Sequence, residues 1–324
     1  MKIYGKKNAV EALTRFSTSG RFPHALLFMG AKGIGRGILA DYGAMLYLCD
    51  KKGAVPCMTC NQCIRVEKHI HPDVIYPLDT MEKGKYNVKD LRNLITECYR
   101  KPNDGEIRVC IFENLDEMSV QCQNALLKFI EEPLPFNRYI FTAAKKSAIL
   151  ETVLSRVTAL PCDEADEADF TEALTEKGIA PERISELYRL FGGNIGAAID
   201  AENNNETIEL YKKAADISSA IAEGREYECG VLFSGIKSRE DLSLILGVLS
   251  EIFAGAAASK SGLTNKGALS EQSKAVSRKL SLKTVCGLYE ECSSLYKKCE
   301  FNPNLQLFAA RCCSSLFTER EKGI

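Results

Sequence analysis

The sequence lacks tryptophan altogether, has only 3 histidines in 324 residues, and has no excess of one charge. Its 42 Lys and Arg residues stand against 43 Asp and Glu residues, for a net charge of −1. A chain with this balance has no global basic field that would draw it onto nucleic acid. Any contact with DNA must therefore come from a local patch or from a larger complex.

Long apolar runs are also missing. The most apolar segment, residues 242–258, contains Ser243, Ser250, Glu251 and two glycines, which favours a buried helix over a membrane span. The first residues, MKIYGKKNAVEALTRF, contain no apolar stretch of the kind found in a secretory signal. We therefore expect a cytoplasmic protein without a membrane partner.

Hydrophobic residues make up 45% of the chain and charged residues 26%, as in a folded globular protein. The length indicates two or three domains. Up to about residue 160, short apolar runs alternate with helical patterns, which predicts a parallel sheet covered by helices on both faces. After Pro161 the strand signals fade and helical patterns run to the end, interrupted at Asn203-Asn204-Asn205, which we interpret as a linker.

A glycine-rich loop, Gly30-Ala31-Lys32-Gly33-Ile34-Gly35-Arg36-Gly37, follows the first apolar run and precedes a helical pattern. This is the context of a P-loop, whose backbone N–H groups bind phosphate and whose signature is G-x-x-x-x-G-K-[ST]. Gly30 and Gly35 match that signature. Arg36 replaces the lysine, however, and Gly37 replaces the hydroxyl residue that binds Mg²⁺. The loop therefore predicts a P-loop fold that no longer hydrolyses nucleotide, and whether it still binds one stays open.

A second departure lies at the end of the apolar run 108–112. A P-loop ATPase needs an acidic metal ligand there, followed by a residue that orients the attacking water. Glu113 could contact a metal through water, but Asn114 cannot act as a base. Two independent departures favour an inactive nucleotide site more strongly than one.

Fourteen cysteines are a high number, and four of them are clustered: Cys49, Cys57, Cys60 and Cys63. Thiolates at this spacing suit tetrahedral Zn²⁺, and four cysteines leave no open position, so we expect a structural site. An iron–sulfur cluster is the alternative, but a ferredoxin run needs a further cysteine three residues on, where Glu67 stands. Unligated thiols are the third possibility.

These features combine in one order along the chain. The P-loop is followed by the cysteine cluster within its helical region and by His71-Pro72-Asp73. The segment Leu126-Leu127-Lys128-Phe129-Ile130-Glu131-Glu132-Pro133 and then Leu154-Ser155-Arg156 come later, before a helical C-terminal region. From Lys2 to about Ala201 this closely resembles the bacterial clamp-loader subunits of DNA polymerase III, which belong to the AAA+ class. The altered P-loop, the altered strand end and Gly196 resemble delta-prime more than gamma/tau, although Val157 departs from the usual cysteine.

The resemblance implies three domains: an AAA+ α/β domain over residues 1–161 with a zinc insertion at 49–63, a helical lid over 162–204, and an all-α collar over 205–324. It implies a ring with gamma/tau and delta subunits that loads the sliding clamp on primed DNA, in which this chain is a rigid stator. ATP is not expected in its own site. Arg156, supported by Ser155, would instead act as an arginine finger at a neighbouring ATP site.

Two other functions stay open. A gamma/tau-like motor with unusual loop residues would hydrolyse ATP by itself, so enzyme activity of this chain is undecided. A zinc-dependent DNA-binding protein would bind DNA without partners, with a steep dependence on salt. In isolation, Ser155-Arg156 is also consistent with an ordinary solvated arginine.

Overall fold

The computed structural model describes residues 1–77, 86–263, 267–299 and 303–322. The chain divides into two compact units, Met1–Glu164 and Ala165–Ile324. The first contains all the strands that the structure describes, and the second is helical throughout its described residues.

The first unit is built on a five-stranded sheet in which every pair of neighbouring strands is parallel. The strand order is β2-β3-β4-β1-β5, with bounds Ala25–Met29 (β1), Val74–Ile75 (β2), Arg108–Phe112 (β3), Asn137–Ala143 (β4) and Thr158–Pro161 (β5). Parallel neighbours need a crossover between them, which the intervening helices supply. The alternation of strand and helix predicted from the sequence is thus confirmed.

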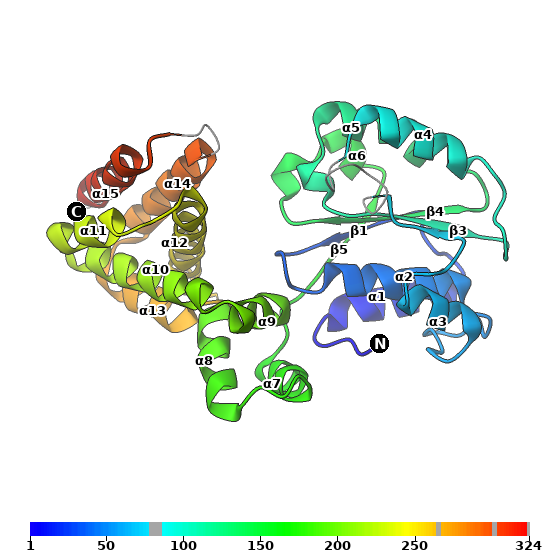
Figure 1. The fold of residues 1–324 in the computed structure, drawn as a ribbon, viewed down its shortest axis with the longest axis horizontal. Helices are drawn as coiled ribbons and strands as arrows, with labels where there is room; N and C mark the ends of the chain where they lie inside the picture. The colour runs from blue at the N-terminus through cyan, green and yellow to red at the C-terminus, as the bar shows by residue number, and fades with distance from the viewer. Residues whose placement is uncertain (78–85, 264–266, 300–302, 323–324) are drawn as a thin grey trace. The chain divides into compact units, whose positions relative to one another are not determined.

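Helices cover both faces of this sheet (Figure 1). On one face lie α1 (Lys7–Ser19), α2 (Arg36–Leu48) and α3 (Asn61–Glu67), and on the other α4 (Val88–Cys98), α5 (Val120–Glu131) and α6 (Glu151–Leu154). Short 3-10 turns occur at η3 (Leu115–Glu117) and η4 (Lys146–Ala148). Because side chains alternate along a strand, Leu26 and Phe28 enter the core with α1 and α2, while Ala25 and Leu27 enter the opposite core with α4 and α5.

The second unit consists of helices with the bounds Glu167–Glu176 (α7), Pro181–Phe191 (α8), Ile195–Asn203 (α9), Asn205–Glu223 (α10), Glu226–Ser234 (α11), Arg239–Lys260 (α12), Ser270–Lys279 (α13), Leu282–Cys299 (α14) and Leu305–Lys322 (α15). By length and composition alone α12 could cross a membrane. Many of its apolar side chains, among them Leu246, Leu249 and Phe253, are fully buried, and it packs against α10, α13 and α14. The predicted buried helix is therefore confirmed.

The linker predicted at Asn203-Asn204-Asn205 is shorter than expected. Helix α9 includes Asn203 and α10 begins at Asn205, so only Asn204 separates them. The Asn204 side chain accepts a hydrogen bond from the Glu206 N–H (3.1 Å), so an asparagine that resembled a linker residue serves as a helix cap. The division of the helical region into a lid and a collar at residues 204/205 stays a prediction.

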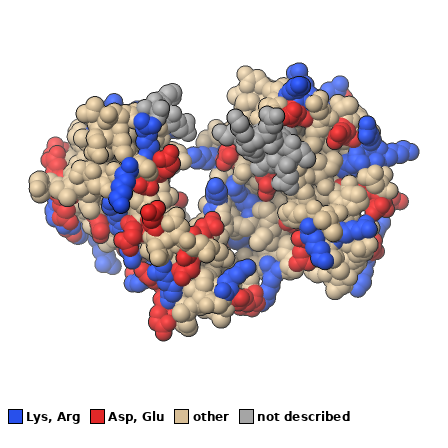
Figure 2. All heavy atoms as spheres, viewed as in Figure 1, with Lys and Arg blue, Asp and Glu red and all other residues tan. Residues whose placement is uncertain are grey.

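Both charge signs are interspersed on each unit on the face drawn in Figure 2, as the near-zero net charge leads one to expect. The parallel sheet, the glycine-rich loop after β1 and the helical remainder confirm the predicted architecture, an α/β unit followed by an all-α region.

Candidate functional site

The glycine-rich loop connects β1 to α2 at the carboxyl edge of the sheet, where the other parallel strands also end. Gly33 and Gly35 have φ angles of 84° and 96°, in the left-handed region that favours glycine. Gly30 is required for another reason: a Cβ there would lie 3.0 Å from Cys162 Cβ and 3.1 Å from the Cys162 carbonyl oxygen. The segment after β5 is thus packed directly against the loop.

Arg36 lies inside the protein at the start of α2, with only 9% of its surface exposed. Its Nη2 donates a hydrogen bond to Asn114 Oδ1 (3.2 Å), and the Asn114 N–H donates to Thr142 Oγ1 (3.1 Å). Its buried Nη1 has no hydrogen-bond partner within the part of the chain that the structure describes. The two residues that depart from the ATPase pattern, one in the loop and one after β3, therefore contact each other.

Two further charged residues adjoin the loop. Lys6 is 3% exposed, and its Cε lies 3.6 Å from where a Cβ on Gly35 would stand. The Glu113 Oε1 lies 3.5 Å from where a Cβ on Gly37 would stand, beside the first turn of α2. The carboxylate that follows β3 therefore lies next to the glycine-rich loop, as its position after the strand led us to expect. The sequence indicated Glu113 but gave no signal for Lys6.

The four clustered cysteines converge. The Sγ atoms of Cys49, Cys57, Cys60 and Cys63 all lie within 4.8 Å of one another. A tetrahedral zinc with bonds of about 2.3 Å places its sulfurs about 3.8 Å apart, so this spacing fits. Three backbone N–H groups point at these sulfurs: Cys57 N to Cys49 Sγ (3.4 Å), Cys60 N to Cys57 Sγ (3.3 Å) and Cys63 N to Cys60 Sγ (3.5 Å).

The surroundings of the cluster shift its thiols in opposite directions, and burial raises the pKa of Cys63. Hydrogen bonds from Thr59, and further ones from Cys60, lower the pKa of Cys57 to about 6. Cys49 and Cys63 are buried, and both belong to the core beneath α1 and α2. The donor set could therefore hold a metal ion as a structural part of this core.

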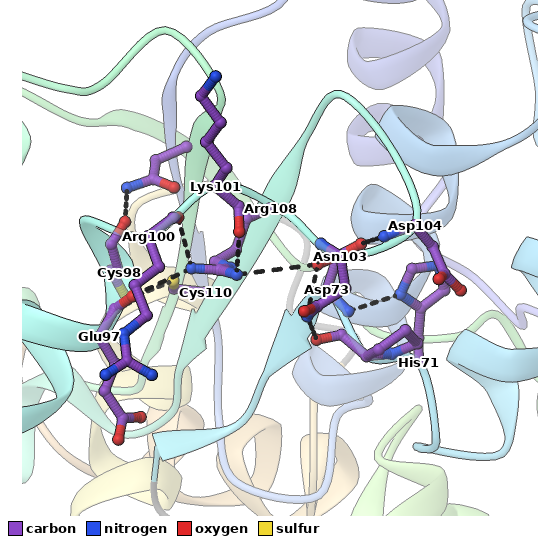
Figure 3. Close-up of polar contacts among 12 residues, drawn as sticks. His71, Asp73, Glu97, Cys98, Arg100, Lys101, Asn103, Asp104, Arg108 and Cys110 are labelled. Carbon is purple, nitrogen blue, oxygen red and sulfur yellow. Dashed lines mark hydrogen bonds and ion pairs between the residues drawn. The ribbon is translucent and has the colours of Figure 1, made fainter.

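His71 and Asp73 connect the cysteine segment to the sheet (Figure 3). The His71 Nδ1 accepts the Asp73 N–H (3.0 Å), so Nε2 carries the proton and donates to Gln62 Oε1 (2.7 Å) on α3. Burial lowers the pKa of His71, in keeping with this neutral ring. The Asp73 carboxylate is fully buried and accepts the N–H groups of Asn103 (2.6 Å) and Asp104 (2.8 Å).

Arg108 completes this network from β3. Its Nη2 lies 3.9 Å from Asp73 Oδ1, and its guanidinium donates to the carbonyls of Glu97 (3.1 Å), Arg100 (2.8 Å) and Lys101 (3.0 Å) at the end of α4 (Figure 3). The sequence indicated His71-Pro72-Asp73 only through the resemblance. The structural role of this motif is to hold the loop after α4 against the cysteine segment. The sequence did not predict that role, because Arg108 lies 35 positions after Asp73.

Ser155 and Arg156 form a surface site at the end of α6. Arg156 is 38% exposed in its side chain, and its Nε forms an ion pair with Glu131 Oε1 on α5 (2.8 Å). Its Nη1 donates to the Thr152 carbonyl (2.8 Å) and to Ser155 Oγ (3.0 Å). Ser155 thus contacts the arginine that it was predicted to support. Glu131 is a partner that the sequence gave no reason to single out.

Comparisons with known proteins agree with these features. Residues 5–165 match the family model described as "DNA polymerase III, delta subunit". The subunit delta' of Bacillus subtilis is 28% identical over 202 residues, covering 62% of this chain and 60% of the relative. A gamma subunit of Buchnera aphidicola is 30% identical over 156 residues, covering 48% of this chain and 41% of the relative. Each alignment thus spans less than two thirds of the relative.

A solved structure of a gamma-subunit-related protein from Thermotoga maritima covers 96% of this chain and 99% of its own, at 13% identity and a TM-score of 0.42. The family match coincides with the α/β unit, which contains the altered P-loop, the cysteine cluster and Arg156. Over residues 5–165, the α/β unit thus belongs to the family described as "DNA polymerase III, delta subunit", and its relatives include delta', gamma and tau subunits of DNA polymerase III.

Proposed function

We propose that this chain is a delta-prime-like stator of a clamp loader, which supplies an arginine finger in trans and hydrolyses no ATP in its own P-loop. The contact between Arg36 and Asn114 carries the proposal, because it joins the two positions that an ATPase would use for phosphate and for water. The partners would be gamma/tau and delta subunits, with the sliding clamp and primed DNA bound through the assembled complex. The site of action would be the cytoplasm.

The loop and the end of β3 together lack three groups that hydrolysis needs. Arg36 replaces the compact lysine charge, and its guanidinium is turned toward the end of β3. Gly37 has no hydroxyl for Mg²⁺. Asn114 cannot take a proton from water.

Arg156 has the properties that a finger requires. It is exposed, permanently charged and attached to the short turn between α6 and β5. In ATP hydrolysis a water oxygen bonds to the γ-phosphorus as the bond to the β–γ bridging oxygen breaks, giving ADP, inorganic phosphate and a proton. A guanidinium from a neighbouring subunit stabilises the charge on the γ-phosphate oxygens in that transition state without exchanging its own proton.

The cysteine cluster would hold one Zn²⁺ through Cys49, Cys57, Cys60 and Cys63. Four thiolates leave no coordination position for water or substrate, so the ion would supply folding energy and no chemistry. His71 and Asp73 would then connect this metal-supported segment to the sheet.

Co-purification tests the proposal directly. The chain, co-expressed with the gamma/tau and delta subunits of its own organism, should elute with them as one ring-sized species. The chain alone should show no ATP turnover above background. The gamma and tau relatives favour a second candidate, a motor subunit, which predicts robust turnover by the chain alone. That result would replace the stator with the motor.

A further inference from the structure

Arg156 is held on two sides. Glu131 contacts its Nε, whereas the Thr152 carbonyl and Ser155 Oγ accept from its Nη1. Nη2 has no polar contact among the residues that the structure describes. The guanidinium is therefore held at Nε and at Nη1, and Nη2 remains available for a further contact.

The group that holds Nε is itself on a rigid support. Glu131 is the last residue of α5, and that helix is anchored in the core by Leu126, Phe129 and Ile130. Arg156 follows α6, which Val153 anchors in the same core. Because both supports are buried on one side of the sheet, the pair has a fixed spacing although its charged groups are exposed.

We infer that Glu131 is a positioning residue for Arg156, which orients the guanidinium so that Nη2 points outward toward the ATP of a neighbouring subunit. This inference rests on the proposed finger and goes beyond it, because it assigns a role to a residue that would never touch nucleotide. An arginine side chain has four rotatable bonds, and a side chain fixed in advance loses less freedom when it reaches the phosphate.

The negative charge of Glu131 can position Arg156 without removing a proton from its guanidinium. The arginine stays protonated throughout, so the carboxylate exchanges nothing with it. The carboxylate contacts the guanidinium at Nε, which leaves Nη2 for a charge-assisted contact with phosphate. Loss of Glu131 should therefore leave the finger present but poorly aligned.

The experiment uses rings assembled from this chain and its gamma/tau and delta partners, with clamp-stimulated ATP hydrolysis as the measurement. Glu131→Ala should lower kcat at the finger-dependent site about 10-fold, with the KM for ATP unchanged. Glu131→Gln keeps an acceptor without charge and should recover part of the loss. Glu132→Ala, at the exposed neighbouring position, is the matched control and should behave as the parent does.

A double-mutant cycle separates alignment from general destabilisation. In rings that already carry Arg156→Ala, Glu131→Ala should cause no further loss, and the melting temperature of the chain should be the same with and without Glu131. An unchanged or raised rate in Glu131→Ala overturns the inference, as does an equal loss in the Arg156→Ala background. If Arg156→Ala itself has no effect, the finger in the proposed function fails instead.

Discussion

Two arginines of the α/β unit have opposite surroundings. Arg36 is 9% exposed and bonded to Asn114 beside the glycine-rich loop, whereas Arg156 is 38% exposed in its side chain and paired with an exposed glutamate. An exposed ion pair is worth about 1 kcal/mol or less, so Glu131 can orient Arg156 while adding little to the stability of the fold. A buried arginine bonded to a neutral amide cannot turn outward without losing that contact and leaving the amide unpaired.

The comparison teaches that the chemical group alone does not decide the role of an arginine. The guanidinium of Arg36 is turned inward and contacts Asn114, whereas the guanidinium of Arg156 is exposed and can contact a partner. In this chain the inward arginine explains why no ATP turnover is expected, and the outward one is the proposed contribution to a neighbour's reaction.

The largest effect is expected for Arg156→Ala in assembled rings. Hydrolysis at the adjacent ATP site should fall about 10³-fold, because transition-state charge would lose its cation. Whole-ring turnover should fall only partly, because other subunits supply the remaining sites. The variant should still join the ring, which size-exclusion chromatography measures. If such rings hydrolyse ATP and load clamps at the normal rate, Arg156 is an ordinary surface residue. Its role would then not differ from that of other exposed arginines, and the proposed functional difference from Arg36 would be wrong.

The next effect is one of stability. Asp73→Ala should lower the free energy of unfolding by about 3 kcal/mol, because it removes a buried carboxylate that faces Arg108 and accepts two backbone N–H groups. Asp104→Ala is the control: it removes an exposed ion pair with Arg65 and should cost less than about 1 kcal/mol.

Denaturant unfolding of the two variants makes that measurement. Equal stability of both would show that the Asp73 network is not what holds the loop after α4. The Asp73 variant also gives a reference for the Arg156 variant. A chain that is merely destabilised should assemble poorly into rings, whereas rings that lack the Arg156 finger should assemble well and hydrolyse ATP slowly.

Zinc loss should have a smaller and more local effect. Elemental analysis should find about one Zn²⁺ per chain, and Cys60→Ser or a strong chelator should remove it. Hydrogen exchange should then rise within residues 49–71, since metal binding energy is also folding energy there. Finger-dependent hydrolysis should change little. A brown iron chromophore, or a chain without metal, would contradict the structural zinc site.

The smallest change is expected from restoring the loop. The double variant Arg36→Lys, Gly37→Thr should still show no ATP turnover above background by the isolated chain, because Asn114 supplies no base. A coupled phosphate-release assay with a catalytically active gamma/tau subunit as positive control measures this. Strong turnover by the double variant would show that Arg36 and Gly37 together, without Asn114, had silenced the site.

Several features could be predicted from the sequence because they depend on local patterns. Alternating apolar runs and helical patterns predicted the parallel sheet, and the sequence's own spacing brought the four cysteines into one cluster. The altered loop residues, Arg36 and Gly37, were visible directly. Each of these signals lies within a short stretch of chain, where spacing along the sequence limits spacing in the fold.

Contacts between distant segments needed the tertiary structure. Arg36 meets Asn114 across 78 positions, and no local pattern links them. Glu131 and Arg156 meet because α5 and α6 are anchored in the same core, and Arg108 reaches Asp73 because β2 and β3 are neighbours in the sheet. The sequence by itself determined which groups this protein carries. Only the packing of helices on the sheet decided which of these groups meet. Residues far apart in the sequence come within hydrogen-bond range where the chain reverses direction, and the chemistry of a side chain does not specify where that happens.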